Sequence, residues 1–412
     1  MVRNIAVVGA GIGGLCSALA LVKRGFKVTV YEQAATISEV GAGLQLSPNA
    51  VQVLNQLGLA AALSPYVFRP NNAIMRHYQS GKNYFSVPLG DSCLQRFGAE
   101  YWHIHRADLH RVLYQACMQN QVNLRLNSPI SSYLHREDNN GVDLLLNNAE
   151  KIHHDLVIGA DGIHSKIQTT LLHNLGLSSK PRFTGQVAWR GTVKTKDLPP
   201  NLIEPSANLW VGPGKHFVSY YLRDGDEVNF VAVEERTDWQ QESWSQQGDI
   251  AQLKGLFVGW HPQVQEILGA THNTFLWALH DREPLSRWVD KKVALLGDAC
   301  HPMLPFLAQG AAMAIEDAYV IAALLKTQQH TPAALQQYQN LRLARTRSIQ
   351  LNARKNASLY HMSTQLDRAK LKVLAALSGS GISSFLASQK LQEIYGHNVV
   401  QNMESLPTST TH

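Results

Sequence analysis

A glycine-rich turn close to the N-terminus constrains the fold of this chain more than any other feature. Residues 4–8 (NIAVV) are apolar and rich in β-branched side chains, and residues 9–14 (GAGIGG) follow directly and open a helical pattern. A second strand pattern follows at residues 27–32 (KVTVYE). Glycines are needed where such a turn is tight and where the backbone must approach a pyrophosphate. The sequence therefore predicts a βαβ unit that binds a dinucleotide.

Glu32 lies at the end of the second predicted strand. A carboxylate at this position accepts hydrogen bonds from both ribose hydroxyls of an adenosine and repels a 2′-phosphate, so the site is expected to prefer FAD or NAD over NADP. The residues expected to contact the dinucleotide in this unit are Gly9, Gly11, Gly13, Gly14 and Glu32.

Length and composition indicate a chain that can enclose a bulky cofactor. Its 412 residues exceed the length at which a single hydrophobic core stops growing. Of these residues, 45% are hydrophobic and 17% are charged. The net charge is +6, but Lys and Arg are scattered, so nucleic acid is not expected as a partner. No uninterrupted apolar run reaches the roughly 18 residues of a membrane span, and stable membrane insertion is not expected. A fairly apolar stretch at 371–386 is predicted to be a C-terminal helix with a break.

The four cysteines lie far apart and form no CxxC pair. This spacing favours a reducing, cytoplasmic location and neither a disulfide framework nor a metal site. They are Cys16, Cys93, Cys117 and Cys300.

Helix and strand patterns predict that the nucleotide-binding unit is interrupted by a second sheet. Residues 72–102 lose helical periodicity, and a helix pattern returns at 106–120. Residues 182–280 are rich in the β-branched and aromatic side chains that favour strands. A strongly apolar helix is predicted at 311–326, followed by further helices to about residue 395.

Three further segments, in this order along the chain, resemble the motifs of one enzyme family. They are residues 105–109 (HRADL), 159–165 (GADGIHS) and 297–302 (GDACHP). With the glycine turn, they resemble the class A flavoprotein aromatic hydroxylases of the 4-hydroxybenzoate hydroxylase type. The nearest resemblance is to salicylate hydroxylase-like proteins, 3-hydroxybenzoate 6-hydroxylase and 6-hydroxynicotinate 3-monooxygenase. It spans nearly the whole chain and implies FAD as the cofactor.

The resemblance also implies a fold class and a division of the chain. We expect a mixed α/β (α+β) fold with a Rossmann-like, GR2-type FAD-binding domain, an interleaved β-sheet substrate domain and C-terminal helices. The predicted segments are 1–71, 105–181 and 281–330 for the FAD-binding domain, 72–104 and 182–280 for the substrate domain, and 331–412 for the C-terminal helices and tail.

Family motifs assign cofactor contacts to several positions. In the family, the arginine at Arg106 reaches the flavin side of the pyrophosphate, and the aspartate at Asp161 helps to position both cofactors. The aspartate at Asp298 bonds the ribityl chain. Gly43, in residues 41–45 (GAGLQ), lies in a segment that resembles the family's flavin-contacting loop.

The helix predicted from residue 311 has an electrostatic role of its own. Unpaired backbone N–H groups and the positive end of the helix face whatever lies in front of Gly310 and Ala311. In the family this is one edge of the flavin ring. Positive potential there stabilises the anionic reduced flavin, which must react with oxygen.

The resemblance implies an enzyme, an FAD-dependent aromatic-ring monooxygenase that uses NADH or NADPH as a transient co-substrate together with O2. In that family a hydroperoxide at flavin C4a is the electrophile, so the ring that it attacks must be electron-rich, usually because a ring hydroxyl has lost its proton. The expected substrate is a small hydroxylated aromatic or heteroaromatic acid, similar to salicylate.

A base for that proton is predicted in residues 212–220 (GPGKHFVSY). His216 and Tyr220 lie four positions apart on a predicted strand, so they point from the same face. A histidine is a workable base near neutral pH, and we expect His216 as the base and Tyr220 as a proton relay. The same spacing occurs in the relatives named above.

Three further residues are expected to line the substrate pocket: Gln45, Pro305 and Phe306. Gln45 stands where the hydroxynicotinate enzyme carries a histidine, and Pro305 replaces a glutamine of 3-hydroxybenzoate 6-hydroxylase. Both departures disfavour those two activities and leave the individual substrate open. Cys300 stands where the family usually has alanine, and we interpret it as a small buried thiol.

Alternatives remain at this stage. One is hydroxylation of a larger quinone or quinolone ring, with the apolar C-terminal segment at a wide entrance. A second is an FAD-dependent dehydrogenase or reductase that never activates oxygen, and a third is an FAD-binding sensor. No second glycine fingerprint follows a strand, which disfavours enzymes with a separate NADPH domain. The sequence allows a homodimer and does not choose between NADH and NADPH, nor decide whether decarboxylation accompanies hydroxylation.

Overall fold

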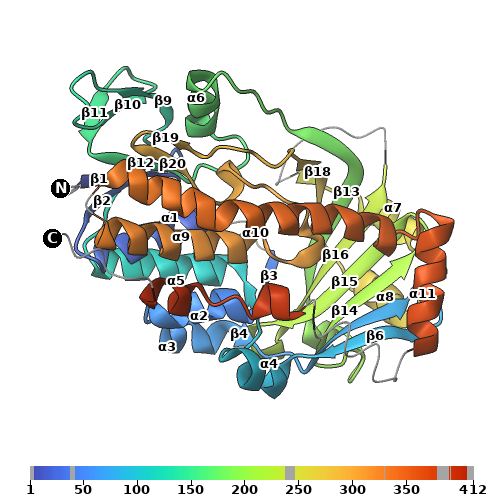
Figure 1. The fold of residues 1–412 in the computed structure, drawn as a ribbon. Coiled ribbons are helices and arrows are strands. Elements are labelled where there is room, and N and C mark those ends of the chain that lie inside the picture. Colours follow the sequence, from blue (N-terminus) through green and yellow to red (C-terminus); the bar gives the residue numbers. More distant parts are fainter. Residues whose placement is uncertain are drawn as a thin grey trace.

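Two large sheets and one long helix organise the molecule. The computed structural model describes residues 4–37, 42–236, 246–328, 330–377, 389 and 391–405. A six-stranded sheet lies on the left of Figure 1 and an eight-stranded sheet on the right. Helix α10 (Thr331–Tyr360) runs across both of them.

The six-stranded sheet is built around the strand that precedes the glycine turn. Its order is β19-β20-β12-β1-β2-β8, and all its pairs are parallel except β19 with β20. The strands are β1 (Asn4–Val8), β2 (Lys27–Tyr31), β8 (Asn123–Arg125), β12 (Leu156–Gly159), β19 (Val289–Asp290) and β20 (Val293–Leu295). Ile5 to Val8 are buried, as expected for a parallel strand covered on both faces. Helices α1 (Ile12–Val22), α5 (Arg106–Gln119), α6 (Lys166–Asn174) and α9 (Gly310–Thr327) accompany this sheet.

The eight-stranded sheet has the order β17-β18-β13-β16-β15-β14-β5-β6 and is antiparallel except where β14 pairs with β5. Its strands are β5 (Asn72–His77), β6 (Asn83–Pro88), β13 (Arg182–Lys194), β14 (Ser206–Gly212), β15 (Lys215–Leu222), β16 (Glu227–Glu235), β17 (Gln246–Gln247) and β18 (Phe275–Asp281). Strands of the two sheets therefore alternate along the chain. The exact domain boundaries stay predictions.

Smaller elements connect and cover the two large sheets. One three-stranded sheet contains β3 (Gly43–Leu46), β7 (Trp102–His105) and β4 (Val67–Phe68), and another contains β9 (Ile130–His135), β10 (Val142–Leu146) and β11 (Lys151–His154). The remaining α-helices are α2 (Pro48–Gln56), α3 (Ala60–Leu63), α4 (Gly90–Phe97), α7 (Ile250–Leu256), α8 (Pro262–Gly269), α11 (Gln365–Leu377) and α13 (Val399–Glu404). The 3₁₀ helices are η1 (Ser64–Tyr66), η2 (Thr195–Asp197), η3 (Arg223–Gly225), η4 (Gly297–Ala299) and η5 (Pro305–Leu307).

The two faces of the eight-stranded sheet bury different cores. On one face, Phe217 and Phe230 pack with Phe257 and Trp260 beside α7 and α8. On the other face, Val233 packs against Phe306 of η5 and against small residues of α10. Because side chains alternate along a strand, the His216 side of β15 faces the second of these cores.

Local structure departs from the sequence expectations in three places. Residues 90–97 form helix α4, although the segment around them shows no helical periodicity, because only Cys93 and Phe97 of this short helix are buried. Helices α7 and α8 lie within the segment expected to be β-rich, and Asp249 caps the first of them through the N–H of Ala251. The helix predicted at 371–386 begins earlier, at Gln365, and its predicted break lies outside the described residues.

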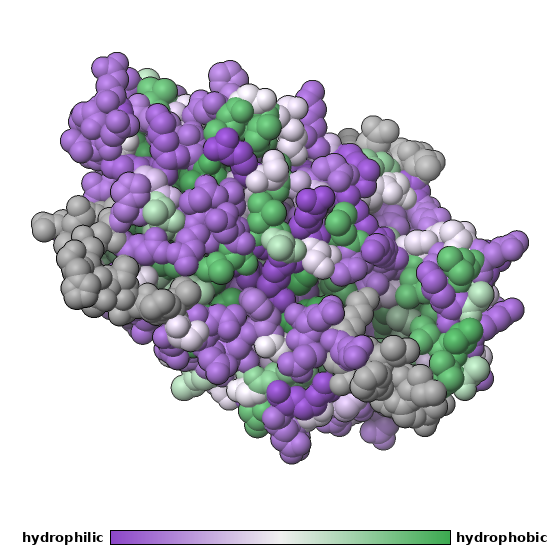
Figure 2. All heavy atoms as spheres, in the orientation of Figure 1, coloured by the Kyte–Doolittle hydropathy of each residue, from purple (hydrophilic) through white to green (hydrophobic). Residues whose placement is uncertain are grey.

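Polar side chains cover most of the face shown in Figure 2, with hydrophobic residues between the two halves and over α11 at the right edge. Leu366 and Val373 of α11 are 64% and 57% exposed. Within the described part of the chain, every helix is too short or too polar to cross a bilayer.

Candidate active site

The glycine turn has the geometry of a cradle. Gly9 has a φ of +101°, and a Cβ there would lie 2.5 Å from the carbonyl oxygen of Ala160. A Cβ on Gly14 would overlap the carbonyl oxygen of Gly9. The turn itself thus requires glycine at both positions. A Cβ on Gly11, in contrast, would meet nothing within 4 Å, so this stretch of backbone is open to a ligand.

Gly13 and Glu32 connect the turn to its surroundings. A Cβ on Gly13 would lie 2.8 Å from Leu296 Cδ2. Helix α1 can therefore pack this closely against the loop after β20 only because residue 13 has no side chain. Glu32 Oε2 accepts a hydrogen bond from the N–H of Ala10 at 2.8 Å, and Oε1 accepts one from the N–H of Ala34 at 2.9 Å. The carboxylate is thereby held beside the turn at the carboxyl end of β2.

Asp161 anchors the loop after β12. Its carboxylate accepts hydrogen bonds from Ser165 Oγ at 2.5 Å and from the N–H groups of Lys166 and Ile167 at 2.8 and 3.2 Å. These donors belong to the beginning of α6, so Asp161 caps that helix. Burial raises the pKa of Asp161, and these hydrogen bonds oppose the rise. The side chain therefore shapes the loop, while the backbone of the loop borders the glycine turn.

Asp298 is the exposed residue of an otherwise buried turn. It lies in η4, directly after β20, between buried Gly297 and Ala299. Surrounding protein raises the pKa of Asp298 through desolvation, while the charges of His301 and Arg106 lower it. Arg106, at the beginning of α5, is therefore close enough to Asp298 to act on it. A carboxylate at the carboxyl end of a parallel strand stands where ligands bind in such sheets.

A closed set of charges lies behind this loop, and we name it the α9–α10 charge network. Asp317 accepts hydrogen bonds from His301 Nε2 at 2.5 Å and from Arg342 Nε at 2.7 Å. Arg342 also pairs with Glu316 at 2.5 Å, and Arg345 pairs with Glu316 at 2.7 Å. Desolvation alone would raise the pKa of Glu316, but Arg342 and Arg345 outweigh it and hold that pKa at about 2.

Neutral side chains extend this network to the N-terminus of α9. Asn49 of α2 donates to Glu316 at 2.6 Å and to Gln309 at 3.2 Å. Gln309 in turn donates to Ser47 Oγ at 2.8 Å. Gln309 is the residue before Gly310 and Ala311, so the network fixes the helix end that was expected to face the flavin.

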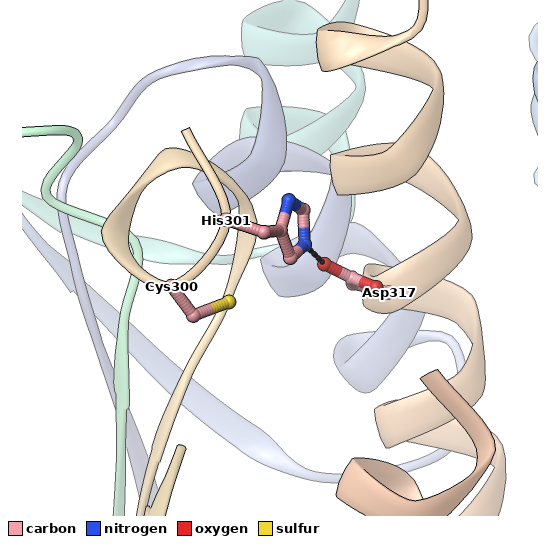
Figure 3. Close-up of side chains that lie close together, drawn as sticks. All are labelled: Cys300, His301 and Asp317. Atoms are coloured by element: carbon pink, nitrogen blue, oxygen red, sulfur yellow. Dashed lines mark hydrogen bonds and ion pairs between the residues drawn. The ribbon is translucent and has the colours of Figure 1, made fainter. Parts of the chain in front are cut away.

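Cys300, His301 and Asp317 come close enough to resemble a metal site (Figure 3). His301 Nε2 is already bonded to Asp317, and the Cys300 thiol donates to the carbonyl oxygen of Gly297 at 3.4 Å. Burial and the nearby carboxylates raise the pKa of Cys300 well above its usual value, which keeps it a neutral thiol. Arg342 already supplies the positive charge that balances Asp317. These side chains are therefore better explained as members of the charge network.

His216 lies in a second, aromatic environment. Its ring is 1% exposed and stands edge-on to Phe306 and Tyr360, with ring centroids 5.0 and 5.4 Å away. Nδ1 of His216 is 2.8 Å from Nε2 of His361, the residue after α10. Burial, and then the nearby His361, lower the pKa of His216 well below its usual value. His216 is therefore neutral near pH 7.

Tyr220 stands on the same face of β15 with different neighbours. Its ring centroid is 4.6 Å from that of His103, and a Cβ on Gly43 would lie 2.7 Å from its hydroxyl. Asn229 accepts a hydrogen bond from the N–H of Gly43 at 2.8 Å. Gly43 thus allows β3 to approach the large sheet. Tyr220 and His216 do not contact each other, because four residues along a strand span roughly 13 Å.

The three pocket residues expected from the sequence lie in different settings. Gln45 accepts a hydrogen bond from the hydroxyl of Tyr101 at 2.8 Å. Phe306 is buried against His216, and its carbonyl oxygen accepts a hydrogen bond from the Tyr360 hydroxyl at 3.0 Å. Pro305 is exposed at the start of η5. The structure thus brings Phe306 to the predicted base and leaves Pro305 at its edge.

Several neighbours of these residues were not found from the sequence. His361 and Tyr360 come from the end of α10, where no motif marks them. Arg190 of β13 carried a signal, because a charged residue stands inside an otherwise apolar strand pattern. Its guanidinium lies 4.9 Å from the centre of the Trp277 ring. Burial, and then the charge of Arg106, lower the pKa of Arg190 to about 10, while Tyr220 opposes the change.

Comparison with known proteins decides the family. The family described as FAD binding domain matches residues 3–353. A 3-amino-4-hydroxybenzoate 2-monooxygenase of Streptomyces platensis is 38% identical over 360 residues, which are 87% of this chain and 89% of that protein. The chain belongs to this FAD-binding family.

Other relatives of this flavoprotein agree. The 3-hydroxybenzoate 6-hydroxylase of Polaromonas naphthalenivorans (strain CJ2) is 35% identical over 87% of this chain and 88% of its own length. Among solved structures, a salicylate hydroxylase substrate complex aligns with a TM-score of 0.83 and 25% identity, covering 100% of this chain and 99% of the other. Klebsiella pneumoniae HpxO, complexed with FAD and uric acid, aligns with a TM-score of 0.82 and 28% identity over 94% and 97%. These matches confirm the resemblance to flavoprotein aromatic hydroxylases, the mixed α/β fold and FAD as the cofactor of a monooxygenase.

Proposed function

We propose that this flavoprotein uses NADH or NADPH and O2 to hydroxylate a small aromatic or heteroaromatic acid that already carries a ring hydroxyl. The observation that carries the proposal is the neutral, buried imidazole of His216 among aromatic rings. Phe306, one of these rings, follows the loop that holds Asp298. A base in this place can take a proton from a phenol without first losing one of its own.

FAD fits the cradle described above. Gly11 leaves open space for the pyrophosphate, Glu32 lies beside the turn where it can bond the adenosine ribose, and Asp298 is exposed just after the carboxyl end of β20. Arg106, Asp161 and Gly43 border the same region. When bound, FAD accepts a hydride from the nicotinamide and activates oxygen. Gly310 and Ala311, at the positive end of α9, stabilise negative charge on its ring.

His216 prepares the substrate. The imidazole accepts the proton of the ring hydroxyl, which leaves an oxygen anion and makes the ring richer in electrons. The rings of Phe306 and Tyr360, which pack against the imidazole, keep water away from it. Tyr220 lies too far along β15 to receive this proton from His216, so its role in the proposal is to line the pocket beside Gly43 and Gln45.

A carboxylate on the substrate is supported by charge and by the relatives. The charge of Arg106 lowers the pKa of Arg190, and the charge of Arg190 opposes the rise in the pKa of Tyr220. These two cations give this side of the pocket a positive potential. Named relatives act on 3-amino-4-hydroxybenzoate, 3-hydroxybenzoate and 6-hydroxynicotinate, and each of these carries a carboxylate and a ring hydroxyl. We also place the enzyme in the cytosol, because its four cysteines are free and buried.

The test is turnover of a defined panel. The FAD-loaded enzyme is mixed in air with NADH or NADPH and with hydroxylated benzoates, nicotinates and quinolines. Nicotinamide oxidation is followed by absorbance and products by mass. We expect at least one acid to accelerate oxidation and to yield a product heavier by one oxygen, or by one oxygen less a carboxyl group. Oxidation that no acid accelerates would refute the acid assignment and favour a larger quinolone-like ring or a dehydrogenase.

A further inference from the structure

The predicted base is the inner end of a hydrogen-bonded chain that leads to the surface. His216 Nδ1 is 2.8 Å from His361 Nε2, and His361 Nδ1 is 3.0 Å from Glu235 Oε1. The side chain of His361 is 0% exposed, whereas that of Glu235 is 47% exposed. The chain therefore begins in the aromatic pocket and ends in water within two hydrogen bonds.

With His361 in its neutral form, hydrogen-bonding rules fix the direction of both bonds in this chain. An ionised carboxylate only accepts, and the bond from His361 lowers the pKa of Glu235, so His361 Nδ1 carries the proton. His361 Nε2 is then an acceptor, and His216 Nδ1 must donate to it. The free lone pair of His216 is consequently on Nε2. Among the described residues, nothing bonds that nitrogen.

Three neighbouring side chains bear on this arrangement. From α10, the Tyr360 hydroxyl donates to the carbonyl oxygen of Phe306. Ser363 Oγ donates to the same Glu235 oxygen at 3.0 Å. Gln186 Nε2, which can only donate, lies 3.4 Å from His361 Nδ1. The shorter bond from Nδ1 to the acceptor-only carboxylate of Glu235, at 3.0 Å, decides that this nitrogen carries the proton.

Three charged side chains next to this hydrogen-bonded chain are engaged elsewhere. Glu234 accepts a hydrogen bond from Trp189 Nε1, on the opposite face of β16, and Arg236 pairs with it there. Lys215 Nζ donates to the carbonyl oxygen of Leu256. In the described part of the protein, Glu235 is thus the only carboxylate bonded to His216 or His361.

We propose that His361 and Glu235 carry the substrate's phenolic proton from His216 to solvent, and we call the three residues the imidazole relay. This inference rests on the proposed function. The phenolic O–H bond breaks as an N–H bond forms at His216 Nε2. The Nδ1 proton of His216 moves to His361 Nε2, and the Nδ1 proton of His361 moves to Glu235, which releases it to water. The reverse shift returns a proton to the product oxygen and restores the starting tautomers.

The relay solves a problem of charge that a lone histidine would face. An imidazolium among Phe306, Tyr360 and Val233 would be costly because its charge would be desolvated. In a relay, one proton leaves His216 as another arrives, so the imidazole stays neutral and the substrate's oxygen anion is the only charge that the transfer leaves in the pocket. His361 is thus a positioning residue that also moves a proton, and Glu235 is the exit.

The first experiment compares His361→Gln, Glu235→Gln and Ser363→Ala in the FAD-loaded enzyme. Glutamine at position 361 keeps a hydrogen-bonding side chain but cannot exchange protons between two nitrogens. We expect His361→Gln to lower kcat by ~10–100-fold with little change in KM, and to remove the dependence of kcat on pH near neutrality. Glu235→Gln should lower kcat less. Ser363→Ala, which removes only an outer bond to Glu235, is the matched control and should retain the parental rate.

Rates also separate the two proposals. If His216→Gln abolishes hydroxylation while His361→Gln keeps the parental rate and pH profile, the relay is wrong and the proposed function stands. If no acid of the panel is turned over, the proposed function fails, and the relay is judged by the second experiment alone.

The second experiment needs no turnover. ¹⁵N spectra of histidine-labelled protein report which ring nitrogen carries the proton, and the signals are assigned from their loss in His216→Gln and His361→Gln. We expect protonated Nδ1 in both histidines. Glu235→Gln should change the tautomer of His361 and also that of His216, two bonds away, whereas Ser363→Ala should leave both unchanged. A His216 signal that ignores Glu235→Gln would overturn the relay.

Discussion

His301 and His216 are both 1% exposed, yet the hydrogen bonds of His301 stay inside the protein whereas those of His216 lead to the surface. His301 bonds Asp317, whose charge is balanced by Arg342 in a network enclosed by α9 and α10. His216 bonds a second histidine, whose partner carboxylate reaches water. A buried imidazole is therefore structural when its protons have nowhere to go, and it is suited to proton transfer when its partners lead out of the protein.

A substitution in the enclosed α9–α10 charge network should have the largest effect on stability. Arg342→Met leaves Glu316 and Asp317 buried without their shared cation, and removing one partner of a buried ion pair costs about 3–5 kcal/mol. We expect a large loss in the free energy of unfolding together with loss of FAD, measured by thermal denaturation and by flavin fluorescence. Arg347→Met, on an exposed position of the same helix, is the control. An Arg342→Met protein as stable as the control would show that the network is not structural.

Breaking the open side should impair catalysis while sparing the fold. His216→Gln should lower kcat for a phenolic acid by ~100-fold or more, because general-base catalysis is worth factors of this size. FAD content and melting temperature should stay near parental values. Tyr220→Phe should lower kcat less than tenfold, since Tyr220 lies outside the relay. Equal effects of the two substitutions would instead favour Tyr220 as a proton carrier.

Two glycines of the cofactor-binding turn separate the stability of the turn from its affinity for FAD. Gly14→Ala forces a Cβ against the carbonyl oxygen of Gly9, and overpacking of this kind costs about 1–3 kcal/mol. Both stability and FAD affinity should fall. Gly11→Ala meets only open space, so the FAD-free protein should melt normally while its FAD affinity falls. Calorimetry with and without FAD measures both quantities. Normal FAD binding by Gly11→Ala would show that the pyrophosphate does not lie beside Gly11.

Acid should affect the neutral histidines before the charge network. Burial lowers the pKa of His103 to about 3 and that of His154 to about 4, so below the ordinary histidine pKa the unfolded chain binds more protons than the folded one. Stability should fall as the pH drops from about 6.5 to about 4 for His154 and to about 3 for His103, at up to roughly 1.4 kcal/mol per pH unit for each group. The pKa of Glu316 is lowered from 4.5 to about 2, so its stabilising contribution is lost progressively as the pH falls from about 4.5 towards 2.

The change in the free energy of unfolding between pH 7 and 5 can be assigned in part to one of these side chains, His103. His103→Phe should flatten it, as measured by urea denaturation at several pH values. An unchanged gradient would mean that His103 contributes none of it. This is the smallest of the expected effects.

What the sequence could predict depends on how local the physics is. Residues 9–14 act through their own backbone, and Asp298 is marked by the strand before it and the helix after it, so both are visible as short patterns. His216 shows only its strand face. Its partner His361 is 145 positions away, and Glu235 is 126 positions from His361. Such pairs form only when α10 packs across the sheet, so no local pattern reveals them.

The long helix α10 has a consequence for how the protein is made. It has 30 residues, which corresponds to about 45 Å, and it carries Arg342 toward one end while His361 follows the other. Synthesis proceeds from the N-terminus, so Asp317 and His216 are both made before the helix that completes their surroundings. A nascent chain that stops short of residue 361 would lack the relay, and one that stops before residue 342 would also leave buried acids unbalanced. Both the charge network and the imidazole relay can therefore form only after this late segment has been synthesised.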